Sequence, residues 1–450
     1  MAHASLPPGP RMPTPIQAAL WALRPLDMMD RCHRRYGELF TLRVRRRPWV
    51  LLSNPEHVKK VFTTAPELVG AGAAEANPLL GPLLGPSSVM LLDEPGHMQD
   101  RKRMVPAFHG ELMANYGEMM ADVAKREIAG WPVGQPFALW PRMQAISLEV
   151  VVRATFGEID GTRFERLREH LVALTNWIND PRRLAVLAAL GSRSMTSRRQ
   201  FRELLAPVEQ IVLDEVRERR ALAGSDGSNA AEERGILATL ERSHAESGTQ
   251  MGDQKLRDEL ITLVSDGPTA TSLAWAFERL LRHPDKLARL REEVLAGDSE
   301  EYLDAVVKEV LRMCPAVPLV MRRLIEPMEL GPYRIPADTI VAPCVYLMHQ
   351  REDVYPDAGV FRPERFLDAS TGTYTWIPFG GGVRRCVAAV FAPLEMRRVI
   401  RVVLEEVDLD AVERRSEGAS RSSVSFAPDG GALVIASRRR PVEARSEAAV

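Results

Sequence analysis

A glycine-rich run with a cysteine behind it is the part of the chain best suited to chemistry. Three consecutive glycines, Gly380–Gly382, lie just before Cys386, and the apolar segment Val387–Glu395, which predicts a helix, follows. Glycine has no Cβ, so this backbone can approach a flat, bulky group closely. A cysteine at a helix N-terminus favours the thiolate, because the dipole stabilises negative charge, and Arg384 and Arg385 add positive charge. These residues predict a haem–thiolate site.

The spacing of the residues around the cysteine is more specific than the cysteine itself. The run resembles the haem-binding signature of the cytochrome P450 family, F-x-x-G-x-R-x-C-x-G followed by x-x-F-A-x-x-E. Ala388 replaces the usual last glycine, and the matching positions are Phe379, Gly382, Arg384, Cys386, Phe391, Ala392 and Glu395. A lone cysteine beside a turn is most often a plain buried thiol, but matches at fixed spacing outweigh that interpretation. The resemblance implies haem b, with Cys386 as the iron ligand and Phe379, Gly380 and Arg384 at the cofactor.

The composition is typical of a globular protein. The 450 residues are 45% hydrophobic, and 59 basic against 60 acidic side chains leave a net charge of -1, so no nucleic-acid partner is indicated. The cysteines show no metal-binding spacing, which favours a reducing compartment. Arg24 interrupts the apolar stretch Ile16–Leu23 well short of the ~20 residues that cross a bilayer. We therefore expect a cytoplasmic, monomeric bacterial protein without a membrane anchor.

The resemblance implies a mainly α fold with a smaller β region, in which the haem lies between a central distal helix and the helix after the cysteine. We expect an extended Pro-rich segment over 1–15, a single haem domain over 16–436 and a disordered tail over 437–450. The local patterns predict strands at 38–44 and 49–53, a helix capped by Asn54, an irregular loop over 69–86, helices through 111–220, a surface loop at 223–229 and a hairpin around Pro428–Gly431.

A second motif is expected to support the cysteine loop without taking part in chemistry. Glu309 and Arg312 are three residues apart on a predicted helix, a spacing that is usually a solvated surface contact. The segment Phe361–Phe366 resembles the family's F-x-P-E-R-F and supplies Arg365. The resemblance implies that Glu309, Arg312 and Arg365 form a buried triad that fixes the loop carrying Cys386.

Cationic side chains are expected to bind the haem propionates. His97 and Arg101 are four residues apart and share one helical face, and in the family this H-x-x-x-R pair bonds a propionate. Arg384 and Arg322 complete the set by resemblance, with Arg322 favoured over Arg323. Two carboxylates in a partly buried site require such partners.

A basic patch near the thiolate is a further expectation. It would dock an acidic ferredoxin by electrostatic steering, although ordinary solvated charge explains the same residues equally well. Its members are Lys102, Arg103, Arg385, Arg397 and Arg398.

The central distal helix departs from the family pattern. The family usually reads A/G-G-x-D/E-T there, an acid and a threonine that deliver protons during dioxygen activation, whereas this chain reads Ser265-Asp266-Gly267-Pro268-Thr269-Ala270-Thr271. Alignment from the right puts Gly267 and Pro268 in place of the pair, and alignment from the left puts Thr269 and Ala270 there, so the segment is two residues short. Asp266 and Thr269 remain as candidate proton-delivery residues.

The resemblance implies a monooxygenase that hydroxylates or epoxidises a hydrophobic small molecule with O2. Its electrons would come from a separate ferredoxin and ferredoxin reductase. The altered distal segment keeps two alternatives open: a peroxygenase or another reaction without a dioxygen proton relay, and a haem protein that binds a ligand without turnover.

Overall fold

Helices make up most of the molecule. The computed structural model describes residues 6–44, 46–71, 77–157, 159–180, 199–223, 235–246, 248, 251–264, 267–367, 372–422 and 425–439. The α-helices are α1 (Thr14–Leu23), α2 (Pro25–Tyr36), α3 (Pro55–Thr63), α4 (Asn77–Leu84), α5 (Gly96–Met104), α6 (Glu111–Ala129), α7 (Leu139–Phe156), α8 (Gly161–Asn179), α11 (Arg199–Ala223), α12 (Ile236–Glu246), α13 (Asp253–Val264), α14 (Pro268–Arg282), α15 (Pro284–Ala296), α16 (Glu301–Met313), α17 (Val345–His349) and α18 (Phe391–Glu406). Short 3-10 turns are η1 (Pro66–Leu68), η2 (Val105–Phe108), η3 (Pro363–Phe366) and η4 (Gly382–Arg384).

The strands form small sheets beside the helices. They are β1 (Leu39–Leu42), β2 (Trp49–Leu52), β3 (Val69–Gly70), β4 (Pro136–Ala138), β5 (Arg322–Leu324), β6 (Met328–Leu330), β7 (Tyr333–Ile335), β8 (Ile340–Pro343), β9 (Val407–Ala411), β10 (Ala419–Ser422), β11 (Ser425–Pro428) and β12 (Leu433–Arg438). One sheet has the order β1-β2-β8-β5-β3 and another the order β4-β12-β9. The mainly α fold with a smaller β region agrees with the prediction.

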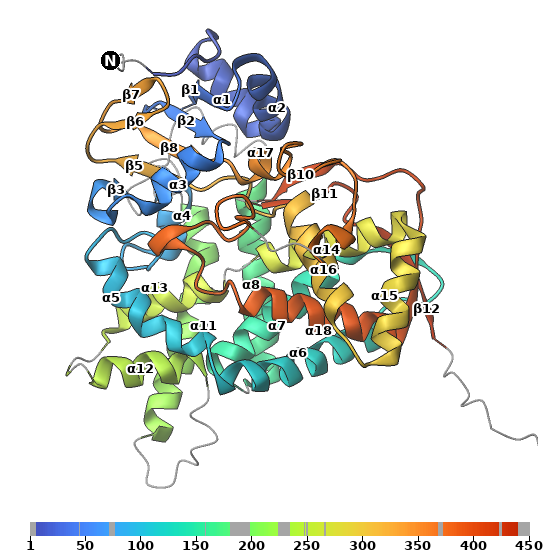
Figure 1. Cartoon of the computed structure of the whole chain (residues 1–450). Coiled ribbons are helices and arrows are strands. Elements are labelled where there is room, and N and C mark those ends of the chain that lie inside the picture. Colours follow the sequence, from blue (N-terminus) through green and yellow to red (C-terminus); the bar gives the residue numbers. More distant parts are fainter. Residues whose placement is uncertain are drawn as a thin grey trace, which may run out of the picture.

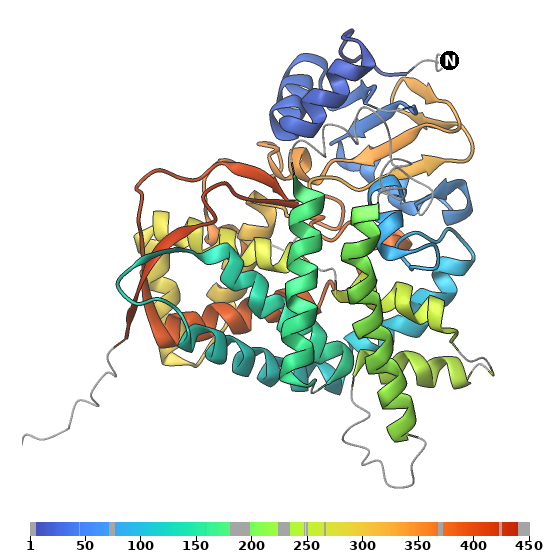
Figure 2. The ribbon, with the colours of Figure 1, turned by 180° about the vertical axis from the view of Figure 1, so that it is seen from behind.

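Two lobes are visible in Figure 1: the β1-β2-β8-β5-β3 sheet with α1 and α2 at the top, and the long helices below. From behind, α8 and α11 run side by side (Figure 2), and they pack against each other. One large apolar core joins the helices, and a second apolar cluster lies around the sheet. The helical lobe therefore holds α13 and α14, while the sheet lobe supplies Arg322 at its β5 strand.

The first strands and helix follow the local sequence closely. Strands β1 and β2 pair antiparallel with Phe40 opposite Leu51, and both strands are buried throughout. The Asn54 side chain accepts hydrogen bonds from the backbone N–H groups of Glu56 and His57, so it caps α3 as predicted. The Pro-rich segment lies along β1, because Thr41 N–H donates to the Pro8 carbonyl at 2.9 Å.

Three local predictions differ from the structure. The segment predicted as an irregular loop over 69–86 contains β3 and helix α4, although Pro82 lies inside that helix. The turn at Pro428–Gly431 exists, but its flanking strands do not form a hairpin: β11 pairs with β10, while β12 pairs with β4 and β9. The tail predicted to be disordered over 437–450 begins inside strand β12, which runs to Arg438. Ala223 of the predicted surface loop ends α11, and residues 224–229 and 440–450 lie outside the described residues.

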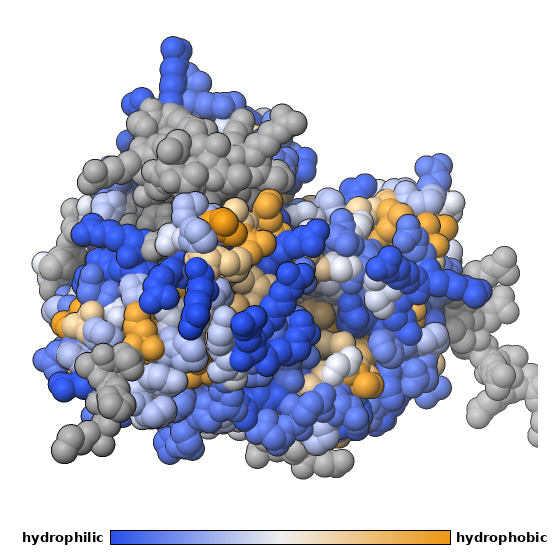
Figure 3. Space-filling view, turned by 90° about the horizontal axis from the view of Figure 1, so that it is seen from above, coloured by the Kyte–Doolittle hydropathy of each residue, from blue (hydrophilic) through white to orange (hydrophobic). Residues whose placement is uncertain are grey.

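The surface is mostly polar. Hydrophilic side chains cover most of the face seen from above, and apolar side chains appear there as separate small groups (Figure 3). Scattered apolar residues of this kind are normal on a globular protein. Among the described residues, no helix is both long enough and apolar enough to cross a bilayer.

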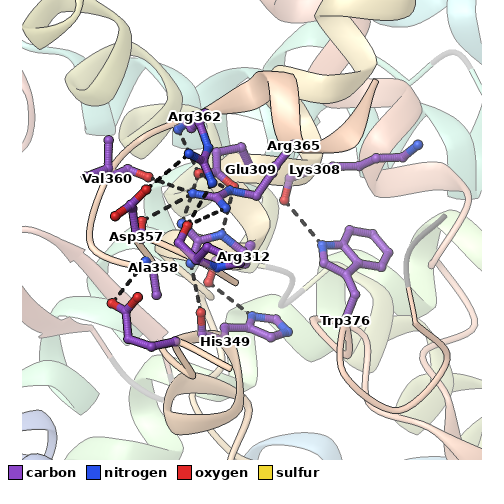
Figure 4. Close-up of polar contacts among 12 residues, drawn as sticks. Lys308, Glu309, Arg312, His349, Asp357, Ala358, Val360, Arg362, Arg365 and Trp376 are labelled. Atoms are coloured by element: carbon purple, nitrogen blue, oxygen red, sulfur yellow. Dashed lines mark hydrogen bonds and ion pairs between the residues drawn. The ribbon is translucent and has the colours of Figure 1, made fainter. Parts of the chain in front are cut away.

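A buried charge network joins α16 to the segment that leads to Cys386. The Glu309 carboxylate accepts from Arg312 Nε at 2.7 Å and Nη2 at 2.9 Å, and from Arg365 Nε at 3.1 Å (Figure 4). The Arg362 N–H adds a bond to Glu309 Oε1 at 2.8 Å. Glu309 and Arg312 are fully buried, so these bonds offset the cost of removing both charges from water.

His349 extends this network toward the cysteine loop. Its Nδ1 bonds the Arg312 carbonyl at 3.0 Å, and its Nε2 accepts the Ile377 N–H at 2.9 Å. Because Nε2 accepts, Nδ1 must donate and the ring is neutral. Burial and the neighbouring Arg312 lower the pKa of His349 to about 3, which keeps it neutral at physiological pH. Trp376 Nε1 donates to the Lys308 carbonyl at 3.3 Å, so two adjacent residues are held to α16 and α17.

We expect Glu309→Ala or Arg312→Ala to yield little soluble, haem-loaded protein. Removing one member strands the other charge in the interior, at a cost of about 3–5 kcal/mol. Thermal unfolding and haem content per chain measure the effect. The control is Glu203→Ala, which breaks the exposed Arg199–Glu203 pair (2.6 Å) and should change stability by less than about 0.5 kcal/mol. Normal haem content in Glu309→Ala would show that the pair does not support the site.

Candidate functional site

The cysteine lies in a closed loop between η4 and α18. Cys386 N–H donates to the Phe379 carbonyl at 2.9 Å, and the Cys386 side chain is exposed. Helix α18 begins only at Phe391, after a turn, so the prediction that Cys386 stands at the helix N-terminus is wrong. The dipole effect fades within a turn, and positive charge comes instead from Arg101, which interacts electrostatically with Cys386.

The glycines before the cysteine are required by a protein contact. A Cβ on Gly381 would lie 2.3 Å from the Phe62 ring, and one on Gly382 would lie 2.4 Å from the Phe62 carbonyl oxygen. Gly382 also has φ +66°, a conformation that other residues rarely adopt. We expected these glycines because of the close approach of a flat cofactor. Close packing of the loop on α3 requires Gly381 and Gly382 by itself. Phe379 packs edge-on against Trp376, with ring centroids 6.1 Å apart.

The structure brings the four predicted cationic residues to one region. Electrostatic interactions join His97 to Arg101 and Arg384, and Arg384 to Arg322. Arg322 is buried, at 7% exposure, whereas Arg323 lies 3.8 Å from the exposed Asp338. The four side chains come from α5, β5 and η4, which lie far apart in the sequence.

Two of these arginines lack a carboxylate partner in the described part of the chain. Arg322 donates to backbone carbonyls, those of Met321 at 2.9 Å and Gly381 at 3.5 Å, and no ion pair forms at Arg322 or at the half-buried Arg101 among the described residues. Burial and the neighbouring Arg384 lower the pKa of Arg322 to about 10. Buried cations require anionic partners, so a group carrying two carboxylates, such as haem, fits this site.

Arg384 is already held in place by the protein. It donates to the carbonyls of Val89 and Leu92, and its ion-pair distances are 3.7 Å to Asp93 and 3.9 Å to Glu94. The residue therefore ties the cysteine loop to the segment 85–92 that precedes α5.

The distal helix is interrupted where the sequence departs from the family. Helix α13 is described up to Val264 and α14 begins at Pro268 with Gly267 as its N-cap, so the segment Pro268–Thr271 is helical. Thr269 is buried in the first turn of α14. Asp266 lies outside the described residues, so the structure does not place it relative to Thr269.

Buried acids on α13 hold the segment 85–92 against the distal helix. Ser87 N–H donates to Asp258 Oδ2 at 2.9 Å, and Val89 N–H donates to Glu259 Oε2 at 3.3 Å. The hydroxyls of Ser88 and Thr262 bond at 2.7 Å. Asp258 and Glu259 were not predicted as buried, because acidic residues in a helix look like surface residues until their partners are known.

Glu259 is the acid most affected by this environment. Burial raises its pKa to about 7, against the opposing charge of Lys255, whose Nζ is 3.8 Å away. Lys255 also pairs with Asp100 on α5. A carboxyl group whose pKa is raised on folding binds a proton more tightly in the native state, so its ionisation lowers stability as pH rises.

We expect Glu259→Gln to be more stable than the parent protein above pH 7, by up to about 3 kcal/mol, since one pKa unit is about 1.4 kcal/mol. The difference should shrink as pH falls from about 7 toward the unfolded value near 4.5. Denaturant unfolding between pH 5 and 8 measures it. Glu118→Gln, at an exposed position of α6, is the control and should show no such trend. A parent stability that does not fall between pH 5 and 8 relative to Glu259→Gln would contradict this expectation.

The expected basic patch is only partly available for docking. Lys102 and Arg385 are exposed, but Arg397 bonds Asp304 at 2.9 Å and Arg398 bonds Glu300 at 3.2 Å. Arg103 lies 3.5 Å from Asp100. Three of its five cations are therefore paired within the chain.

Comparisons with known proteins agree with this site. The sequence model of the family "Cytochrome P450" matches residues 7–432. The chain is 39% identical to cytochrome P450 135B1 of Mycobacterium tuberculosis, over 98% of this chain and 94% of that protein. It is 34% identical to cytochrome P450 138 of the same organism, over 96% of this chain and 97% of that protein.

A solved structure has the same fold. The "Retinoic acid bound cyanobacterial CYP120A1" superposes with a TM-score of 0.81 and 20% identity, covering 97% of this chain and all of that one. The fold, the cysteine loop and the family match lead to one conclusion: the chain belongs to the cytochrome P450 family, the haem-containing monooxygenases.

Proposed function

We propose that this enzyme hydroxylates or epoxidises a hydrophobic small molecule in the cytoplasm, with Cys386 as the thiolate ligand of haem b. When bound, the haem supplies dioxygen activation, and the protein supplies binding, orientation and proton delivery. The observation that carries the proposal is that two arginines beside the cysteine loop, the buried Arg322 and the half-buried Arg101, have no carboxylate partner in the described chain. His97 and Arg384 complete the proposed propionate site, beside Phe379 and Gly380.

A hydrophobic substrate is supported by the segments that precede α5 and β5. Leu83, Leu84, Val89 and Leu91 are buried around the first, and Leu319 is buried in the second. We propose that these segments line the substrate pocket, because small-molecule pockets are mostly apolar with a few polar groups that set the orientation.

Separate electron donors are proposed, a ferredoxin with its reductase. The exposed Lys102 and Arg385 are the parts of the basic patch that remain for an acidic partner. Such contacts raise association rates at low salt more than they raise affinity.

A second candidate rests on the interrupted distal helix. Neither alignment frame keeps the acid–threonine pair, and Pro268 starts a new helix at this point. Proton delivery would then depend on Asp266 and Thr269, or the enzyme would use peroxide or catalyse a reaction that needs no such relay. Each alternative keeps the haem–thiolate site.

Cys386→Ser tests the thiolate. We expect it to abolish the thiolate-type Soret band of the reduced, carbon monoxide-bound protein, because an alcohol is a poor iron ligand at neutral pH. Cys314→Ser is the control, since burial raises the pKa of the Cys314 thiol to about 12 and keeps it protonated. An unchanged band in Cys386→Ser would exclude this cysteine as the ligand.

Thr269→Ala tests the proposed proton relay. With a ferredoxin system we expect more hydrogen peroxide and less product per electron pair, and little change when peroxide replaces the electron donors. The control is Ser272→Ala, which removes a hydroxyl that bonds the Pro268 carbonyl at 3.1 Å on the same helix. Coupling that is unaffected by changes at both Asp266 and Thr269 would rule out the substitute relay.

A further inference from the structure

The histidine proposed for propionate binding is itself held by an acid. His97 Nδ1 lies 2.7 Å from Glu94 Oε1, and the other Glu94 oxygen accepts the Met98 N–H at 3.0 Å. Both side chains of the pair are buried, at 4% and 5% exposure. The second carboxylate oxygen is thus fixed by the first turn of α5, and the first oxygen is aimed at the imidazole.

This geometry restricts where the protons of the histidine can be. An ionised carboxylate only accepts hydrogen bonds, so Nδ1 must carry the proton that bonds Glu94. In the neutral ring Nε2 then has no proton and is an acceptor. No described residue bonds Nε2, which leaves it as the atom available to a ligand. A propionate is also an acceptor, so a neutral His97 cannot bond it while Glu94 is ionised.

We propose that the Glu94–His97 pair takes up one proton when a haem propionate binds to it. The pair then holds two protons, one between the two side chains and one on Nε2, which donates to the propionate. The proton comes from solvent, and no bond other than these hydrogen bonds changes. This inference rests on the proposed role of His97 at the propionate.

The charges around the pair explain why the proton arrives only with the ligand. Burial is the largest effect that lowers the pKa of His97, and Arg384 and Arg101 lower it further, against the opposing effect of Glu94. Among the described residues, the charged groups that act on the ring are Glu94, Arg384 and Arg101. A propionate adds a negative charge beside the arginines and offsets the repulsion, so ligand and proton bind together.

Haem retention as a function of pH tests the proposal in the holoprotein. Haem transfer to an excess of apomyoglobin gives the rate of haem loss between pH 6 and 9. We expect the rate of haem loss to rise once the pH is high enough to remove the proton from the pair. For one proton the increase is up to about tenfold per pH unit. His97→Gln keeps an N–H donor that does not titrate, so its rate should be independent of pH over this range.

Glu94→Gln and His109→Gln complete the test. In Glu94→Gln the amide oxygen still accepts from His97 Nδ1 but carries no charge, so the pH above which haem loss becomes faster should be lower. If that pH does not change, Glu94 has no part in the proton uptake. His109 is exposed near the end of η2, and its replacement should leave the parent profile intact. A flat profile in the parent protein, or a step that persists in His97→Gln, would overturn the proton uptake. If His97→Leu, which removes the donor altogether, loses haem no faster than the parent at pH 6, the propionate role of His97 itself fails.

Discussion

A fully buried carboxylate needs partners for its lone pairs, and Glu309 finds them in Arg312, Arg365 and the Arg362 N–H. Arg312 lies on the same helix as Glu309, whereas Arg362 directly precedes η3 and Arg365 lies within it, so satisfying one charge joins α16 to η3 (Figure 4). The cost of breaking such a set is high because the remaining charges cannot return to water. The position of the cysteine loop follows from this requirement through His349, whose neutral ring carries the constraint to the Ile377 N–H.

The sequence predicted those parts of the site that depend on fixed spacing. The spacing of Glu309 and Arg312 alone favours a solvated pair, and the prediction that they associate with Arg365 came from the resemblance to the family motifs. His349 was not predicted, since its role depends on Ile377, 28 residues away. The same holds for Asp258 and Glu259, whose partners Ser87 and Val89 lie 171 and 170 residues away. These acids indicate a structural role only once their side chains are known to be buried.

The errors of the sequence interpretation have physical causes of the same kind. The turn at Pro428–Gly431 has the local chemistry of a hairpin, but the pairing of β11 is decided by β10 and that of β12 by β4 and β9. The apolar run after Cys386 has helical composition, yet its first residues form a turn before α18 begins. Local propensity predicted the elements, whereas tertiary contacts decided the pairing of strands and the first residue of the helix.

Charge separates the two sides of the site. The cysteine side collects arginines, two of which lack acid partners among the described residues, and we propose that the haem propionates bind there. On α13 the buried acids Asp258 and Glu259 lie next to each other, and Arg257 and Lys255 of the same helix pair with them. The segment 85–92 lies between them, since it accepts from Arg384 through its carbonyls and donates to the acids through its N–H groups. One short backbone segment therefore meets both sets of charges without adding a charged side chain of its own at 85–92.

A distal segment two residues short of the family pattern is compatible with this arrangement because α14 has contacts of its own with the C-terminal part of the chain. Trp275 Nε1 donates to the Phe426 carbonyl at 2.7 Å, and Glu278 accepts the Glu417 N–H at 3.0 Å, so α14 is anchored to the C-terminal strands and their connections. Helix α13 is anchored separately, through Asp258 and Glu259, to the segment before α5. A change of length between two independently anchored helices alters the residues beside the haem without displacing either helix. The thiolate side, by contrast, is fixed by buried charges and by glycines packed on Phe62, so it tolerates no such change. In this chain the change of length accordingly falls on the distal side, in the segment for which we propose a role in proton delivery.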